Sequence, residues 1–401
     1  MAIDPVPEQP AAEATDPAVD AVPVVPAIPP DDNEAFAFTG RAADYFRIWV
    51  VNLLLVLLTL GLWSPWAKVR KRRYFYGHTW VAGANFDYHG DPVAILRGRL
   101  LAVAAFGVYW FVDHLWPAGG PWLLLSLVCG VPWIVTRSLT FNAVNSSYRG
   151  IRFGFHCKVR TVAAALSPIL LWPLSVLLAR QDPLAMLGDT TLYTAASFAV
   201  YGVLVAIYPY VVARVRRLTV GHATWGQCAF ASELKTRKVY GIYLIGGLLG
   251  SLILGVLAGG VGGFLGAGMA GADWARSVLL TVFTVALVIA YALGIAIFAS
   301  YTRARMSNLI FNTARLEGVG RFNSTLRARR LASLYFSNLM AIVASCGLLI
   351  PWAVIRVARY RAESLSLVAQ RPIDQVAAGA AGAAGATGEE LAEVFGFDLA
   401  L

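Results

Sequence analysis

The side chains that could bind a metal or take part in catalysis lie mostly in stretches that the sequence predicts to be polar loops. Four of the five histidines fall there with two cysteines and two aspartates: His78, His89, His156, His222, Cys157, Cys228, Asp87 and Asp91. Imidazole, thiolate and carboxylate groups are the usual ligands of zinc and other transition metals. None of these residues has the spacing of H-E-x-x-H or C-x-x-C. We therefore expect no metal or other cofactor, and expect these side chains to form hydrogen bonds within short hairpins.

A second pair of ionisable residues, Asp113 and His114, ends a predicted membrane span. An ionisable side chain inside a membrane helix suggests a function, for example in a proton relay. This pair lies beside Trp116 and Pro117, at the predicted outer end of the span, where water can reach it. An interfacial role is therefore favoured over the proton relay, for which the pair remains a candidate.

The sequence contains no recognised catalytic motif. It lacks the phosphate-binding G-x-x-x-x-G-K-[ST], the nucleophile turn G-x-S-x-G, and a G-x-G-x-x-G between a strand and a helix. We therefore expect that the protein is not an enzyme.

The composition shows which elements must position these residues. Of the 401 residues, 58% are hydrophobic and 14% are charged, against about 25% charged in soluble domains. This excludes an ordinary soluble enzyme, a disordered chain and a disulfide-rich secreted domain. Runs long enough to cross a ~30 Å hydrocarbon core occur at 100–116, 120–136, 161–179, 191–213, 239–265 and 277–300. The sequence therefore predicts a polytopic membrane protein with six clear transmembrane helices.

Charge is distributed unevenly along the chain. Residues 1–35 hold eight acidic residues and no Lys or Arg, and residues 373–401 hold five acidic residues and no base. We interpret 1–35 as a disordered, Pro-rich acidic tail, 36–372 as the membrane domain, and 373–401 as an Ala/Gly-rich flexible tail.

The basic residues predict the orientation in the membrane. The long loops between the six spans contain 25 Lys and Arg, and the short loops contain two. The positive-inside rule places the long loops in the cytoplasm. A basic membrane domain is therefore explained without nucleic acid, and we expect anionic lipid headgroups as partners at the cytoplasmic face. The sequence does not indicate a protein partner or an oligomeric state.

An internal repeat brackets the six spans. Residues 46–76 align without gaps to residues 332–362, with an offset of 286 and ten identities. The candidate motif residues are Asn52, Gly61, Pro65, Trp66, Arg70 and Arg73 in the first copy, and Asn338, Gly347, Pro351, Trp352, Arg356 and Arg359 in the second. A full crossing by the second copy would leave its arginines outside, against the charge rule. Re-entrant copies, with both tails cytoplasmic, are therefore favoured over spanning ones.

Two further patterns concern the helices and loops. Small residues four apart, which let helix backbones approach closely, occur in one span at Gly246, Gly250, Gly255, Gly259 and Gly263. Tight packing is favoured there over the lining of a conduit. In the loops, similar Gly-to-Phe segments end at Phe86, Phe153 and Phe322 and predict short extended or hairpin segments. The predicted fold is therefore all-α, with hairpins confined to the cytoplasmic loops.

Three segments resemble a known family. The first segment, Phe38–Pro92, contains SPWAKVR, RRYFYG and FDYHG. The second is FNTARLEGVGRFNSTLRAR at Phe311–Arg329, and the third is IPWAVIRVARYRAE at Ile350–Glu363. Together they are similar to the YjgN-like family of bacterial inner-membrane proteins, a domain of unknown function. The resemblance covers about 36–365. It implies a multi-span protein of the bacterial inner membrane, without an established activity and without catalytic residues to carry over.

Two functions are consistent with these observations. The first is a transporter or channel-like conduit for a small or anionic solute, because bracketing repeats and glycine-dense helices occur in transporters. The second is a non-catalytic scaffold that binds anionic lipid or a partner protein through its basic cytoplasmic face. A water-accessible cavity lined by Arg70, Arg356, Asn52 and Asn338 would favour transport.

Overall fold

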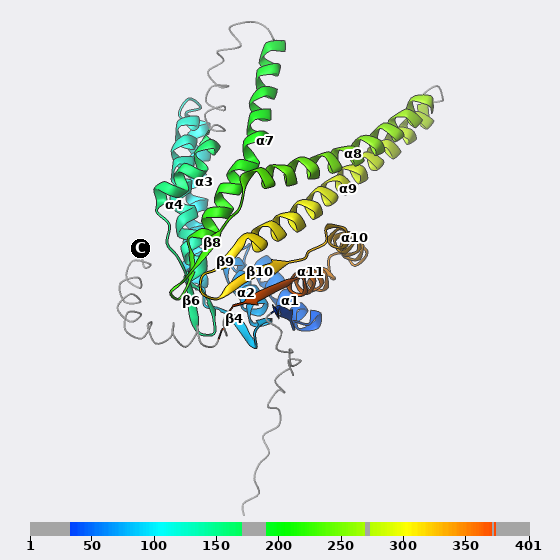
Figure 1. The fold of residues 1–401 in the computed structure, drawn as a ribbon. Coiled ribbons are helices and arrows are strands. Elements are labelled where there is room, and N and C mark those ends of the chain that lie inside the picture. Colours follow the sequence, from blue (N-terminus) through cyan, green and yellow to red (C-terminus); the bar gives the residue numbers. More distant parts are fainter. Residues whose placement is uncertain (1–32, 171–189, 269–272, 371–372, 374–401) are drawn as a thin grey trace, which may run out of the picture. The chain divides into compact units, whose positions relative to one another are not determined.

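The computed structural model describes residues 33–170, 190–268, 273–370 and 373, in which helices alternate with short β-strands (Figure 1). The helices are α1 (Ala42–Leu58), α2 (Ser64–Gly77), α3 (Pro92–Leu115), α4 (Gly120–Val144), α5 (Val159–Leu166), the 3-10 helix η1 (Ser167–Leu170), α7 (Thr190–Gly221), α8 (Thr236–Gly268), α9 (Asp273–Thr313), α10 (Ala328–Ala344) and α11 (Ile350–Glu363). The strands are β1 (Asn33–Ala35), β2 (Ala37–Phe38), β3 (Thr79–Val81), β4 (Ala84–Tyr88), β5 (Ser146–Tyr148), β6 (Ile151–Phe155), β7 (Ala223–Trp225), β8 (Cys228–Ser232), β9 (Ala314–Leu316), β10 (Gly320–Ser324) and β11 (Leu365–Ala369).

The strands form one antiparallel sheet, which makes the all-α prediction wrong. Its strand order within the described residues is β1-β11-β10-β9-β8-β7-β6-β5-β4-β3-β2. The hairpins do follow the helices as expected, but each also pairs with the next, because an isolated hairpin leaves a row of backbone groups unpaired on both edges. The sequence patterns indicate hairpins one at a time and do not show that they join.

The sheet closes on itself at Phe36. The two ends of the strand order, β1 and β2, are separated in the chain by this single residue, whose N–H donates to the Leu365 carbonyl at 3.0 Å. β1 pairs with β11 and β2 pairs with β3. The result is a nearly closed, barrel-like sheet without a free long edge.

A single backbone hydrogen bond marks each junction between sheet and helices. It runs from the residue after one strand to the carbonyl at the end of the next returning helix, and within the described residues it occurs five times. The pairs are Thr39 to His78 (3.0 Å), His89 to Asn145 (2.8 Å), His156 to His222 (2.9 Å), Glu233 to Thr313 (3.2 Å) and Thr325 to Ser364 (2.9 Å). The described chain is therefore a fivefold succession of helix pairs and strand pairs, in which β11 and the β1–β2 segment form the fifth strand pair.

The hairpin turns follow ordinary turn chemistry. In the β3–β4 turn, Ala82 and Gly83 have φ values of 46° and 73°, and in the β5–β6 turn Arg149 and Gly150 have 51° and 77°. Positive φ at both central residues is characteristic of the type I′ turn, whose twist matches that of the flanking strands.

Five described helices are long and apolar enough to cross a membrane, namely Pro92–Leu115, Gly120–Val144, Phe198–Gly221, Thr236–Val256 and Leu280–Thr313. They correspond to five of the six predicted spans. The sixth, 161–179, falls partly on the short helix Val159–Ile169 and otherwise lies outside the described residues. Large apolar side chains are exposed along the five, for example Leu101, Trp133, Val205, Leu252 and Val288.

Each copy of the internal repeat is a helical hairpin that starts and ends at the sheet. α1 follows β2, turns at Leu60 and Gly61, and returns through α2 to β3; α10 and α11 do the same between β10 and β11. At the turns Gly61 and Gly347 both have φ of 92°, which glycine adopts without steric cost. Both ends of each copy therefore lie on the sheet side, as the re-entrant alternative expects.

The sheet extends beyond the expected limits of the membrane domain. β1 begins at Asn33, within the segment that composition assigns to the acidic tail. Ile373, the first residue of the predicted C-terminal tail, is buried in the core of the sheet. The remaining tail residues, 1–32 and 374–401, lie outside the described residues.

Candidate functional site

Ten inward side chains at one level of the sheet form what we call the floor layer. It consists of Phe36, Val81, Phe86, Tyr148, Phe153, Trp225, Phe230, Leu316, Phe322 and Leu367. The strand register places them opposite one another in the pairs Phe86–Tyr148, Phe153–Trp225, Phe230–Leu316 and Phe322–Leu367. Because side chains alternate between the two faces of a strand, this register puts all of these residues on the inner face.

Five phenylalanines, one from each strand pair, line the inside of the floor layer. Adjacent ring centroids lie 6.3 Å apart for Phe36–Phe86, 6.5 Å for Phe86–Phe153, 6.4 Å for Phe153–Phe230 and 6.2 Å for Phe230–Phe322. Three of these four pairs are nearly parallel, with interplanar angles of 14° to 16°. The aromatic rings therefore face the interior of the sheet as an almost continuous apolar surface.

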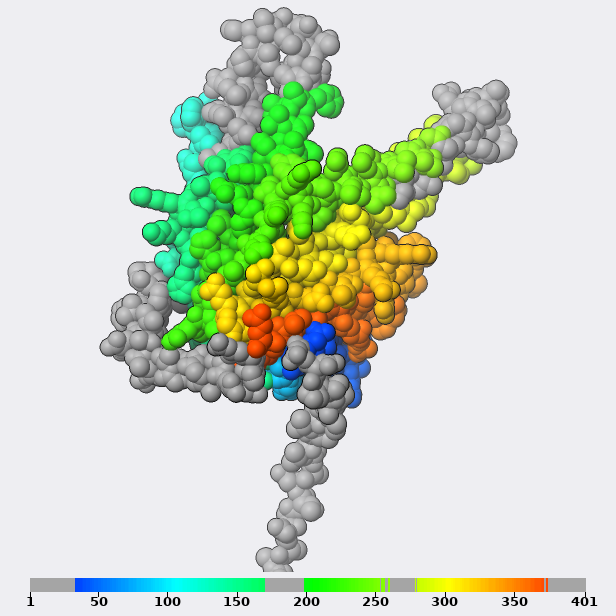
Figure 2. All heavy atoms as spheres, viewed as in Figure 1, coloured from blue at the N-terminus to red at the C-terminus, as the bar shows by residue number. Residues whose placement is uncertain are grey.

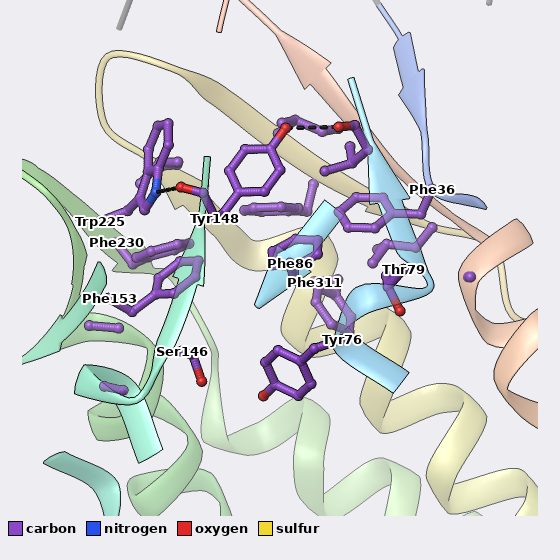
Figure 3. A pocket seen from close by; sticks show the side chains of 18 of the residues that line it. Phe36, Tyr76, Thr79, Phe86, Ser146, Tyr148, Phe153, Trp225, Phe230 and Phe311 are labelled. Carbon is purple, nitrogen blue, oxygen red and sulfur yellow. Dashed lines mark hydrogen bonds between the residues drawn. The ribbon is translucent and has the colours of Figure 1, made fainter. Parts of the chain in front are cut away.

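Tyr148 and Trp225 bring the only side-chain polar groups into the floor layer, and both groups are bonded. The Tyr148 hydroxyl donates to the Val81 carbonyl at 2.8 Å, and the Trp225 indole N–H donates to the Tyr148 carbonyl at 3.3 Å (Figure 3). Burial raises the pKa of Tyr148, against the opposing effect of its hydrogen bond with Arg149. The hydroxyl therefore stays protonated and remains a donor.

A cavity of about 880 Å³, here called the chamber, lies on the helix side of the floor layer. The second helix of each helix pair contributes residues near its sheet-proximal end to the chamber wall. Examples are Tyr76 of α2, Asn142 of α4, Thr219 of α7, Phe311 of α9 and Ala358 of α11. Figure 3 shows Tyr76, Phe311 and Ser146 on the side of the floor layer that faces the helices.

The chamber wall is mainly apolar and carries a few polar groups near the helix ends. These are Tyr76, Thr79, Asn142, Ser146, Thr219, Ser307, Ser324 and Arg361. Arg361 is the one charged side chain among the described lining residues. Its side chain is exposed to solvent and has no hydrogen bond or ion pair to any described residue. Behind the wall, the Arg72 guanidinium donates to the Asn142 amide oxygen and to the Tyr88 hydroxyl, the latter at 2.8 Å.

The structure places the predicted repeat motif away from the chamber. In the second copy, Arg356 donates to the Asn338 amide oxygen at 2.9 Å and lies over the Trp352 ring at 4.4 Å. In the first copy, the distance from Arg70 to Asn52 is 3.4 Å. Both asparagines are buried inside their own helical hairpins.

The other motif residues fasten these hairpins to neighbouring elements. Pro65 and Pro351 are buried in the first turns of α2 and α11, and Trp66 stacks on Trp63 at 5.1 Å. Arg73 donates to the carbonyl of Tyr88, at the end of β4, at 3.2 Å. Arg359 donates to the carbonyl of Gly40, just after β2, also at 3.2 Å. Arg70 and Arg73 border a second, more open hollow of about 520 Å³ outside the chamber.

Two of the predicted packing glycines contact α9. A Cβ added at Gly250 would lie 3.2 Å from the Gly294 carbonyl oxygen, and one at Gly246 would lie 2.9 Å from the Thr302 side chain. α8 and α9 accordingly run side by side (Figure 2). No atom that the structure describes lies within 4 Å of the corresponding positions at Gly255 and Gly259. Gly263 lies outside the residues whose side chains are described.

The remaining candidate residues do not meet at the chamber. Asp113 packs at the α3–α4 turn, where a Cβ on Gly120 would meet its carboxylate, and His114 stacks on Trp110 at 5.7 Å. The loop histidines lie at the sheet–helix junctions, where His78 contacts the Tyr74 carbonyl and His89 contacts the Ser147 hydroxyl. In the described part of the chain, no three His, Cys, Asp or Glu residues gather where they could hold a metal ion.

The amino-acid sequence does not reveal the floor layer as a site. The signal was present in part, because the Gly-to-Phe segments ending at Phe86, Phe153 and Phe322 contain three of its five phenylalanines. The residues paired with these phenylalanines on neighbouring strands, such as Tyr148 and Trp225, are of different types. Only the strand register shows that they lie at the same level.

Comparison with known proteins agrees with a membrane protein. A family model described as "Bacterial protein of unknown function (DUF898)" matches residues 33–394. The chain is 33% identical over 129 residues to "Inner membrane protein YjgN" of Salmonella typhimurium, which covers 32% of this chain and 33% of that protein. The proteins of the same name from Escherichia coli O157:H7 and K12 are 33% and 31% identical, over 131 and 134 residues.

Each of these matches spans about a third of the relative's length, since they cover 33%, 33% and 32% of the three proteins. No solved structure matches the chain. The expected likeness to the YjgN proteins is thereby confirmed, and so is the expectation of a membrane protein with long apolar helices. Because the family model covers nearly the whole chain, the protein belongs to the DUF898 family of bacterial proteins of unknown function.

Proposed function

We propose that this protein is a multi-pass transporter or channel-like conduit of the bacterial inner membrane, and that its solute occupies the chamber. The observation that carries this proposal is a cavity of about 880 Å³ where the helix ends meet a nearly closed sheet. Binding sites in membrane proteins are commonly built between helices at such convergent positions. The solute is small or anionic, since Arg361 supplies the lining with a positive charge.

The proposed orientation puts the sheet in the cytoplasm. Each of the four basic loops identified in the sequence contains one strand pair of the sheet. These are β3–β4 in 67–99, β5–β6 in 137–160, β7–β8 in 214–238 and β9–β10 in 301–330. The positive-inside rule places such loops on the cytoplasmic side. Reporter fusions after Gln370 and before Asn33 test this orientation, and both are expected to report the cytoplasm. A periplasmic signal from either fusion would contradict the proposed orientation.

The repeat arginines have a positioning role in this proposal and do not form the path itself. Arg70 and Arg356 bond to asparagines within their own helical hairpins, outside the chamber. The criterion set from the sequence, a cavity lined by these residues, is therefore not met. Transport is supported instead by a cavity at the sheet, which the sequence did not indicate.

Cysteine accessibility tests the conduit directly. In a background in which the four native cysteines are replaced by serine, Ser307→Cys places a thiol in the chamber wall. We expect negatively charged methanethiosulfonate ethylsulfonate to label this thiol from both faces of membrane vesicles. Leu248→Cys is the matched control, because Leu248 is 60% exposed on the apolar side of α8 and these reagents need a hydrated thiol. Labelling from neither face would refute the conduit, and labelling from one face alone would leave a binding chamber without a through path.

A second function, a scaffold for anionic lipid, is favoured by one specific observation. The residue just before the helix that follows each strand pair is basic and exposed at four of the five described junctions: Arg41, Lys158, Lys235 and Arg327. Basic residues next to membrane helices attract anionic headgroups with about 1 kcal/mol each. Co-purification from vesicles with and without phosphatidylglycerol, for the native chain and for the fourfold glutamine variant, tests this function. Equal lipid retention in the two chains would refute it.

A further inference from the structure

We propose that the chamber binds an anionic amphiphile, a molecule with an apolar body and an acidic head, so that the apolar part rests on the floor layer and the head lies at Arg361. This inference rests on the proposed function and names the substrate class of the same site. Its first support is size, because a volume of about 880 Å³ falls within the range of ~300–1,000 Å³ found for small-molecule pockets.

The floor layer determines the apolar part of the ligand. Phe36, Phe86, Phe153, Phe230 and Phe322 present their rings toward the chamber, and no charged side chain belongs to the layer. Tyr148 and Trp225 use their polar groups on backbone carbonyls. A hydrated ion would find no partners at this surface, whereas an alkyl chain or a ring system would lose unfavourable contact with water.

The described lining residues give a positive head no opposite charge to pair with. Among the described lining residues there is no Asp or Glu. The wall therefore contains no anionic partner for a cation.

Arg361 selects for a negative head. Its side chain lines the chamber and is also exposed to solvent, so its guanidinium keeps five N–H donors that suit a carboxylate or a phosphate. Arg72 adds positive charge behind the wall through its hydrogen bond to Asn142. The amide nitrogen of Asn142 donates one proton to the Ser138 carbonyl and has a second proton left for a ligand.

Such a ligand has two sources, a membrane lipid with one acyl chain or a water-soluble anionic amphiphile, and the probes separate them. The full-length protein in phosphatidylcholine nanodiscs is titrated with 11-(dansylamino)undecanoic acid added from water. In a second arm, a dansyl-labelled lysophosphatidic acid is placed in the nanodisc bilayer. A saturable blue shift of the dansyl emission is expected in at least one arm. A response to the bilayer-held probe alone identifies a lipid, and a response to the water-borne probe alone identifies a soluble amphiphile.

Substitutions locate the probe. Arg361→Gln is expected to weaken binding of the dansyl acid at least tenfold and to leave binding of its methyl ester unchanged, because only the acid has a negative charge that pairs with the guanidinium. Ser307→Trp fills the chamber without removing floor-layer packing and is expected to abolish binding of the acid and of its methyl ester. The matched control is Arg329→Gln, an exposed arginine outside the chamber, which should bind both as the native protein does.

Three results would overturn the inference: no saturable signal in either arm, equal weakening of acid and ester by Arg361→Gln, or undiminished binding in Ser307→Trp. Its failure is distinguishable from failure of the conduit. If the Ser307→Cys thiol is labelled from both faces but no amphiphile binds, only the substrate class is wrong. If the amphiphile binds but the thiol is labelled from neither face, the chamber is a binding site without a conduit.

Discussion

The two copies of the internal repeat allow one substitution to be tested at equivalent positions with different expected effects. Asn338 accepts a hydrogen bond from Arg356 at 2.9 Å and donates one to the Ala353 carbonyl at 3.2 Å. Asn52 accepts from Arg70 and from the Trp63 indole, both at 3.4 Å. Both side chains are buried, so replacement by alanine removes a similar side-chain volume in the two copies, whereas the hydrogen bonds that are lost differ.

The expected magnitudes follow from these distances. A hydrogen bond from a charged donor contributes about 2 kcal/mol and a neutral one about 1 kcal/mol, which gives about 3 kcal/mol for Asn338→Ala. Bonds at 3.4 Å are at the limit of hydrogen-bond geometry, so Asn52→Ala should cost about 1 kcal/mol. With an unfolding entropy of roughly 0.6 kcal/mol/K for ~300 residues, the midpoint should fall by about 5 °C and about 2 °C respectively.

The assay is thermal unfolding of the purified variants in one detergent, read from intrinsic tryptophan fluorescence at a fixed scan rate. Ser333→Ala is the control on the same helix as Asn338, because its hydroxyl bonds only to the Arg330 carbonyl at an exposed position. It should unfold with the native protein. A larger shift for Asn52→Ala than for Asn338→Ala, or no shift for either, would refute the view that these bonds hold the helical hairpins together.

Three further outcomes are expected. Tyr148→Phe removes a buried hydrogen bond of 2.8 Å and should lower stability by about 1–2 kcal/mol, seen as a lower midpoint in the same melting assay. Gly250→Leu should separate α8 from α9, because a Cβ there already lies 3.2 Å from the Gly294 carbonyl oxygen, whereas Gly247→Leu enters open space; proteolysis of the two variants should differ in rate. Burial raises the pKa of Cys228, so its thiolate fraction is low at pH 8. Its alkylation rate should therefore keep rising at pH values where the same cysteine in denatured protein has levelled off, and coincident pH profiles would contradict this.

The fivefold pattern explains why only two of its parts were visible as a repeat. The α1–α2 and α10–α11 hairpins share side-chain contacts, such as the hydroxyls of Tyr74 and Tyr360, which accept from the backbone N–H groups of Arg41 and Arg327 at 2.8 and 2.9 Å. These contacts require particular residue types, which the alignment detects. The five junction bonds join backbone N–H and C=O groups, which every residue here possesses. A pattern held by backbone bonds leaves little trace in the residue types.

The sequence by itself determined the class of protein and the position of its long apolar helices. Twenty-residue apolar runs have one stable environment, so five of the six predicted spans coincide with long apolar helices. The repeat hairpins were also apparent, because Gly61 and Pro65 act within a single turn of chain. These are local properties, set by neighbours a few residues away.

Only the tertiary structure decided that the hairpins form one sheet and that the sheet contains a chamber. Phe36 and Leu365 are far apart in the sequence, and their hydrogen bond closes the sheet. Tyr148, Trp225 and Leu367 share no motif with one another, yet the register puts them at one level with the five phenylalanines. The physical reason is that strand pairing depends on backbone groups brought together from distant parts of the chain, and a short apolar strand has no preference for one partner until the edges meet.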